Sequence, residues 1–157
     1  MIKIYSDGAA TMKCINGEYQ RENGGAAMAV IQDEKVIYEE TKHFENTTNN
    51  YCELYAILMA LKYFKKEQSK DILKIYSDSA YCVNMLKSGG WIYSWVKNGW
   101  TRGKKHEPIE NLEIIKEIYR YLEKSKNIEF IKVKGHSGEK DWNDYVDKLA
   151  VKAKMEV

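Results

Sequence analysis

Two short segments of the chain share a sequence, and each ends in an aspartate followed by small residues. Residues 3–9 read KIYSDGA, and residues 74–80 read KIYSDSA. Each segment resembles a strand, so Asp7 and Asp78 are expected at the carboxyl ends of strands, where small residues let another backbone or a ligand approach. The alternative is that two strands of similar composition end in turn-forming aspartates. The repeat therefore needs further chemical groups beside it to indicate a site.

Two more carboxylates lie early in predicted helices. Glu53 comes three residues after Asn50, which also fits a capping box that only satisfies a helix end. Asp147 lies early in the predicted terminal helix, where an acidic residue also complements the helix dipole. The predicted order of elements can bring two strand ends and two helix beginnings to one edge of a sheet. We therefore expect all four carboxylates to converge.

A cluster of four carboxylates repels itself, and burial would keep protons bound unless a cation neutralised the group. Ligands that are all oxygen favour Mg²⁺, with Mn²⁺ as an expected substitute. Mg²⁺ commonly completes its coordination with waters and substrate phosphates. Two such ions about 4 Å apart can activate a water and stabilise a leaving oxygen. The predicted chemistry is hydrolysis of a phosphodiester.

The hydrophobic pattern predicts the elements that must position these groups. Alternation and short apolar runs predict strands at 2–7, 26–31, 36–44, 72–77 and 128–133. Helical spacing predicts helices at 50–64, 79–86 and 109–122 and a terminal helix containing Asp147. The order βββαβααβα implies an α/β fold, a mixed sheet covered by helices. No linker divides the chain, so residues 1–157 are expected to form one domain.

Composition limits the remaining possibilities. Hydrophobic residues make up 44% of the chain and charged residues 31%, which is typical of a soluble globular protein, and no apolar run is long enough for a membrane. The beginning of the sequence lacks the features of a secretory signal, so we expect a cytoplasmic protein. Three cysteines without paired spacing predict free thiols and no zinc site. A net charge of +2 is too small to indicate a polyanionic partner by itself.

Five blocks of sequence together resemble type 1 ribonuclease H over almost the whole chain. The blocks are YSDG at 5–8, TNNYCEL at 48–54, YSDS at 76–79, KGHSG at 134–138 and NDYVDKLA at 143–150. The resemblance implies the ribonuclease H-like fold and endonucleolytic cleavage of the RNA strand of an RNA/DNA hybrid, leaving 5′-phosphate and 3′-hydroxyl ends. It also implies that Asp7, Glu53, Asp78 and Asp147 hold two Mg²⁺ ions, with Asp7 between them.

The resemblance also implies further site residues. His136 is expected to assist proton transfer at the leaving oxygen or product release, although a lone histidine in such a loop is more often a surface residue. Residues 90–107 resemble a basic handle whose lysines neutralise phosphates, and whose tryptophans either contact a deoxyribose or simply pack. Asn49 and Asn50 are expected in the minor groove, with helix capping as the alternative. The full set of expected substrate contacts is Thr48, Asn49, Asn50, Tyr81, Trp91, Trp95, Lys97, Lys104, Lys105 and Asn143.

Some positions depart from the family pattern. The long connection 11–25 lacks a Gly-Asn-Pro-Gly run, and Ala80 stands where a glutamine is common. Two rival functions remain open: a duplex-binding domain without catalysis, and a DNA-cutting relative such as an integrase or a resolvase. The complete carboxylate set favours an enzyme, and the handle with Asn49 and Asn50 favours a hybrid substrate. We expect a monomer that has no membrane partner.

Overall fold

The computed structural model describes residues 1–11, 13–20, 22–67, 70–134 and 142–156. In this part of the chain five strands form one mixed sheet in the order β5-β4-β1-β6-β7. Strand β1 pairs in parallel with β6 and antiparallel with β4, β4 is antiparallel to β5, and β6 is parallel to β7. The strands are β1 (Ile2–Ala10), β4 (Glu22–Gln32), β5 (Lys35–Thr47), β6 (Leu73–Ser77) and β7 (Ile128–Lys132). The predicted five-stranded mixed sheet is therefore confirmed.

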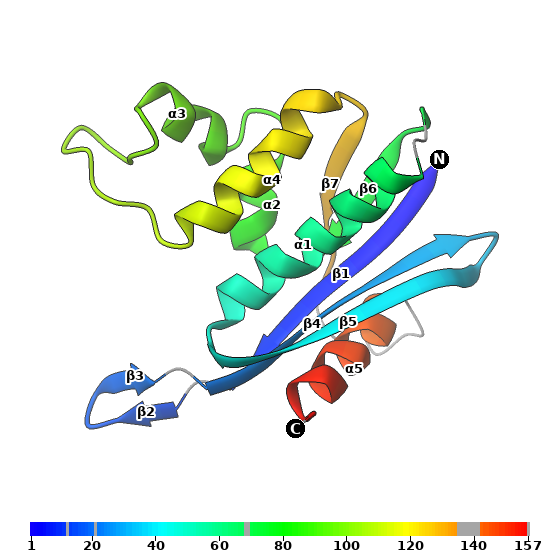
Figure 1. The fold of residues 1–157 in the computed structure, drawn as a ribbon, viewed down its shortest axis with the longest axis horizontal. Coiled ribbons are helices and arrows are strands. Elements are labelled where there is room, and N and C mark those ends of the chain that lie inside the picture. The colour runs from blue at the N-terminus through cyan, green and yellow to red at the C-terminus, as the bar shows by residue number, and fades with distance from the viewer. Residues whose placement is uncertain (12, 21, 68–69, 135–141, 157) are drawn as a thin grey trace.

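Helices cover both faces of this sheet (Figure 1). One face carries a large hydrophobic core to which the sheet and helices α1, α2, α3 and α4 contribute. The opposite face carries α5, whose Val146 packs with Ala29 and Ile31 of β4. The helices are α1 (Asn49–Lys66), α2 (Ala80–Leu86), α3 (Trp91–Lys97), α4 (Leu112–Lys124) and α5 (Trp142–Lys154). None of the described helices has both the length and the apolar character that crossing a bilayer requires.

The alternation of β1 decides which of its side chains meets which helix. Successive side chains of a strand point to opposite faces. Ile4 belongs to the core beneath α1, whereas Tyr5 packs against the cluster beneath α5. Asp7 therefore points to the α5 side of the sheet, like Tyr5, whereas Gly8 points toward α1, like Ile4.

Several elements differ from the sequence prediction. Strand β1 continues to Ala10, three residues beyond Asp7, because β4 pairs with it as far as Gly24. The connection that follows contains a hairpin of β2 (Lys13–Ile15) and β3 (Glu18–Gln20), which turns through two residues of positive φ, Asn16 and Gly17. The segment predicted as a handle contains the short helix α3. Helix α4 begins at Leu112 rather than near Ile109, directly after Asn111 in a left-handed conformation.

Candidate metal centre at the sheet edge

The repeated segments lie side by side as parallel strands. Strands β1 and β6 pair with Ile4 opposite Ile75 and Tyr5 opposite Tyr76. The two tyrosine rings stack with their centroids 4.5 Å apart and an interplanar angle of 10°. Asp7 and Asp78 each follow two residues after this tyrosine pair, so the repeat delivers two carboxylates at the same level of neighbouring strands.

Helix α1 reaches this edge because Gly8 has no side chain. A Cβ atom at Gly8 would lie 2.4 Å from the backbone nitrogen of Glu53 and 2.5 Å from the carbonyl carbon of Cys52. The start of α1 therefore rests directly on β1, as expected for small residues after Asp7. Thr48 is the N-cap of the helix, and its Oγ1 accepts a hydrogen bond from the Tyr51 backbone N–H at 3.2 Å.

The capping alternatives for Asn50 and Glu53 are wrong. Helix α1 starts at Asn49, so Asn50 lies inside the helix and Glu53 lies in its second turn. A threonine hydroxyl satisfies the helix end, as a capping hydroxyl ordinarily does. Glu53 therefore does not cap the helix, and it is buried, with 4% of its surface exposed.

Three carboxylates form a compact cluster. One oxygen each from Asp7, Glu53 and Asp78 lies within 4.8 Å of the others. Asp7 is 2% exposed, and its Oδ1 accepts a hydrogen bond of 2.9 Å from the Gly8 backbone N–H. Among the described residues, Asp7 Oδ2 and Glu53 Oε2 are buried without a hydrogen-bond partner. Buried carboxylate oxygens without a donor are the groups that a cation satisfies, so the residues present fit a divalent metal ion.

The electrostatics of the cluster support the same conclusion. Burial raises the pKa of Asp7 far above its ordinary value, and the negative charges of Glu53 and Asp78 raise it further. Burial also raises the pKa of Glu53, with the charge of Asp78 as the next cause. Without a cation the cluster therefore holds protons near neutral pH, and a bound cation would displace them.

Asp147 approaches the cluster from the α5 side of the sheet, the side to which Asp7 also points. It lies on α5, is half-buried and stands outside the compact group of three. Its carboxyl is close enough to that of Asp7 to contribute to the raised pKa of Asp7. The structure thus brings three of the predicted carboxylates tightly together and places the fourth near Asp7.

The residues predicted to contact substrate at the start of α1 lie next to this cluster. Asn49 and Asn50 are exposed, and Asn49 Oδ1 accepts a hydrogen bond of 3.2 Å from the Ala10 backbone N–H at the end of β1. Thr48 is half-buried because its hydroxyl caps the helix. The exposed amide side chains therefore border the edge where the carboxylates gather.

The predicted handle combines packed aromatic residues with exposed lysines. Trp95 and Trp100 are half-buried against the core, and the Trp100 ring meets Tyr119 edge-on at 5.4 Å. Trp91 is 46% exposed and lies 6.3 Å from both Tyr81 and Trp95, measured between ring centroids. The packing interpretation is confirmed for Trp95 and Trp100, whereas much of Trp91 remains on the surface. The exposed lysines of this segment are Lys97, Lys104 and Lys105.

Of the remaining predicted site residues, Asn143 lies at the start of α5. His136 falls outside the described residues. Asn143 is 2% exposed, and its Nδ2 donates a hydrogen bond of 3.1 Å to the Lys134 carbonyl. The contact observed for Asn143 thus connects α5 to the segment after β7.

Two residues that position α5 were missed by the sequence analysis. Gly25 lies in β4 directly opposite His43 of β5, and both contact the last turns of α5. The Gly24-Gly25 pair carried a signal, because glycine inside a strand marks a close approach of another backbone. Nothing in the local sequence marks His43, whose partner is 110 residues away along the chain.

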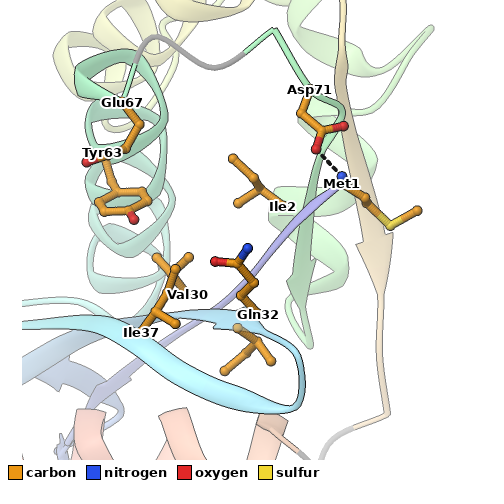
Figure 2. Close-up of a pocket in the computed structure, with 9 residues that line it drawn as sticks. Met1, Ile2, Val30, Gln32, Ile37, Tyr63, Glu67 and Asp71 are labelled. Atoms are coloured by element: carbon orange, nitrogen blue, oxygen red, sulfur yellow. Dashed lines mark hydrogen bonds and ion pairs between the residues drawn. The ribbon is translucent and has the colours of Figure 1, made fainter.

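A hollow at the other end of the sheet is separate from this site. It has a volume of about 440 Å³ and lies where β1 begins, between the end of α1 and the β4–β5 turn (Figure 2). Met1 and Asp71 form an ion pair at its margin. None of its described lining residues belongs to the carboxylate cluster.

The sheet order, with an acidic edge at β1 and β6, is that of the ribonuclease H-like fold. A crystal structure of LC9-RNase H1, a type 1 RNase H with the type 2 active-site motif, superimposes with a TM-score of 0.78 at 24% identity, covering 98% of this chain and 71% of that chain. LC11-RNase H1 in complex with an RNA/DNA hybrid superimposes with a TM-score of 0.68 at 18% identity, covering 98% and 96%. These likenesses confirm the predicted fold.

Similarity of sequence identifies the family to which the chain belongs. The family model described as RNase H matches residues 1–155. Ribonuclease H of Clostridium botulinum (strain Hall) is 37% identical over 150 residues, which cover 96% of this chain and 93% of the relative. The chain therefore belongs to the ribonuclease H family, and it is an endoribonuclease, as the five blocks of sequence predicted.

Proposed function

We propose that this chain hydrolyses the RNA strand of RNA/DNA hybrids at the carboxylate cluster, giving 5′-phosphate and 3′-hydroxyl ends. The observation that carries the proposal is the group formed by Asp7, Glu53 and Asp78, in which buried oxygens of Asp7 and Glu53 lack a donor among the described residues. Family membership supports the reaction, and the fold shared with LC11-RNase H1, solved with an RNA/DNA hybrid, supports the substrate.

The proposed metal ligands are Asp7, Glu53, Asp78 and Asp147. All of their donor atoms are oxygens, which favours Mg²⁺ and allows Mn²⁺ to substitute. When bound, two such ions about 4 Å apart would supply positive charge to both the attacking and the leaving side of a phosphodiester. Asp7 is the most central ligand, because Glu53 and Asp78 lie beside it and Asp147 is close enough on the α5 side of the sheet to raise its pKa.

The protein's own groups orient this centre. The Gly8 backbone N–H holds Asp7 Oδ1, which leaves the other oxygen directed to a ligand. Asp78 is half-buried and follows the end of β6, so it is the member of the compact group most open to a substrate phosphate. For His136 we propose assistance in protonating the leaving oxygen or in releasing product, on the strength of the KGHSG block at 134–138.

We propose that the exposed amides beside the cluster recognise the hybrid. Asn49 and Asn50 can reach sugar edges in the wide minor groove, where the 2′-hydroxyl distinguishes RNA from DNA. Thr48 is proposed at a DNA-strand phosphate, and Tyr81 and Trp91, whose rings are neighbours, at the DNA strand. We also propose substrate contacts for the half-buried Trp95 and for Asn143. The exposed Lys97, Lys104 and Lys105 are proposed to contact phosphates, and their charge makes binding depend on the salt concentration.

A substrate panel tests the proposal against its rivals. Labelled hybrid, DNA duplex and RNA duplex of one sequence are offered with Mg²⁺, with Mn²⁺ and with a chelator, alongside Asp7→Asn as the matched inactive control. We expect cleavage of the RNA strand of the hybrid alone, dependent on metal and lost in the variant. Binding without cleavage favours a non-catalytic domain, and cleavage of the DNA duplex favours an integrase-like or resolvase-like enzyme.

We also propose that residues 1–157 act as a single-domain monomer in the cytoplasm. The continuous sheet and the core shared by four helices support one cooperative unit. Sedimentation at micromolar concentration should give the mass of one 18.3 kDa chain. A heavier species would contradict the monomer, and two separate unfolding transitions would contradict the single domain.

A further inference from the structure

Helix α5 is held at its last turn by a side chain from the edge strand of the sheet. His43 of β5 is half-buried, and its Nδ1 donates a hydrogen bond of 2.8 Å to the Ala153 carbonyl of α5. Carbonyls in the last turn of a helix lack their usual intrahelical partner. The Ala153 carbonyl accepts a hydrogen bond of 3.2 Å from the Glu156 backbone N–H just beyond the helix, and His43 supplies a second donor from the sheet. The negative end of the helix dipole also favours an imidazole N–H there.

Gly25 lets the same part of α5 lie against the sheet. It is the residue of β4 directly opposite His43. A Cβ atom at Gly25 would lie 2.3 Å from the Ala150 carbonyl oxygen and 2.5 Å from the Lys154 backbone nitrogen. The helix backbone therefore rests on the strand backbone. Figure 1 shows α5 lying beside β4 and β5.

The contact between the backbones of α5 and β4 lacks interlocking side chains. The helix presents Ala150 and Ala153 to the glycine, and neither carries the long side chains that interlock packed helices. Burial of small residues favours contact but resists sliding along the helix axis only weakly. Directional hydrogen bonds supply that resistance, because each is kept at only one axial position. One is the His43 bond at the last turn, and the other is the bond of 2.6 Å that the Tyr145 hydroxyl donates to Glu39 Oε1 on the same edge strand.

We propose that Gly25 and His43 form a clamp that sets the position of Asp147 beside Asp7, with His43 as a positioning residue. The inference rests on the proposed function, in which Asp147 helps to hold the metal ions. Ala153 follows Asp147 by six residues, about 9 Å along the helix. A helix of this length moves as one body, so a displacement at Ala153 appears at Asp147.

Four variants test the clamp. His43→Ala removes the donor, and His43→Asn restores one, because the asparagine Nδ2 can occupy the position of the imidazole Nδ1. Ile118→Val, in the core on α4, is a control that lowers stability without touching α5. Asp147→Asn tests the carboxylate itself. Each is measured for kcat and KM on a hybrid and, by calorimetry without nucleic acid, for the Kd of Mg²⁺.

For His43→Ala we expect kcat to fall about tenfold with KM unchanged, because a misplacement of 1 Å costs up to about a hundredfold. The Kd of Mg²⁺ should rise several-fold, and His43→Asn should restore both quantities. The inference is overturned if His43→Ala matches Ile118→Val in kcat and Mg²⁺ affinity, or if His43→Asn is as impaired as His43→Ala. Failure of the wild type to cleave hybrid, or full activity of Asp147→Asn, would instead overturn the proposed function, and the Mg²⁺ titrations of the His43 variants would still test the clamp.

Discussion

Replacing Gly8 by alanine should lower catalysis strongly while the protein stays folded, because the substitution moves Glu53. The new Cβ would lie 2.4 Å from the Glu53 backbone nitrogen and 2.5 Å from the carbonyl carbon of Cys52, whereas ordinary contact begins at 3.4 Å. The start of α1 must therefore retreat from β1 by about 1 Å, since backbone atoms cannot rotate away. Such overpacking costs about 1–3 kcal/mol of stability. The same retreat moves the Glu53 carboxylate, and a 1 Å misplacement lowers catalysis about a hundredfold.

The assay is steady-state cleavage of a labelled hybrid in saturating Mg²⁺, with urea unfolding of the same preparations. Gly24→Ala is the matched control, because its Cβ would come closest to two side-chain atoms, Cys52 Sγ and Thr47 Cγ2, each at 2.6 Å. The backbone atom among its nearest neighbours, the Ala9 carbonyl oxygen, lies farther away, at 3.1 Å. The two side-chain atoms can shift without moving the helix backbone, so we expect kcat within about threefold of wild type. If Gly8→Ala is folded and also stays within threefold of wild type, the proposed placement of Glu53 by Gly8 is refuted.

Four further outcomes are expected. Asp7→Asn should nearly abolish cleavage while raising the metal-free free energy of unfolding at pH 7, measured with urea and a chelator, because the neutral asparagine spares folding the uptake of a proton at this buried position. Since folding raises the pKa of both Asp7 and Glu53, the contribution of these two carboxyls to the stability of the metal-free wild type should be full below about pH 4 and should be lost as pH rises toward and beyond neutrality. Added Mg²⁺ should reduce this loss, and a flat profile of the urea midpoint against pH would contradict it. Replacing Lys104 and Lys105 together by alanine should lower the slope of log Kd against log salt by about 1–2, measured by hybrid binding in a chelator. Thr48→Ala removes the N-cap of α1 and should cost about 1 kcal/mol in urea unfolding, with Thr48→Ser close to wild type.

The sequence predicted most of the sheet because its signals are local. The alternation in β1 and the periodic apolar positions of α1 and α4 identify these elements without knowledge of their partners. The repeated KIYSD segment also predicted two aspartates at strand ends, and the parallel pairing of β1 with β6 gives that repeat its physical meaning. The carboxylate cluster follows from these elements, because each of its members lies on one of them or directly beside it.

The features that were missed depend on pairing across the fold. Strand β1 extends past Asp7 only because β4 pairs with it there. The Asn16-Gly17 turn had a recognisable hairpin sequence, but its short flanks lack the apolar alternation that usually accompanies such a turn. Thr48 caps α1, whereas the sequence analysis considered Asn50. Both residue types are good caps, so the sequence alone could not distinguish them, and only the path of the chain does.

The parallel alignment of β1 with β6 has a consequence for how the acidic edge can vary. Neighbouring strands in any sheet are spaced about 4.8 Å apart by their backbone hydrogen bonds. Asp7 lies on β1 two residues after the last pair with β6, Tyr5 with Tyr76, and Asp78 directly follows the end of β6, so their backbones start from this spacing, which is close to the separation of about 4 Å between ions in paired metal sites. The separation is therefore a property of peptide geometry rather than of any particular neighbour. Substitutions in the surrounding core can lower the stability of the protein without changing the distance between the backbones that carry Asp7 and Asp78.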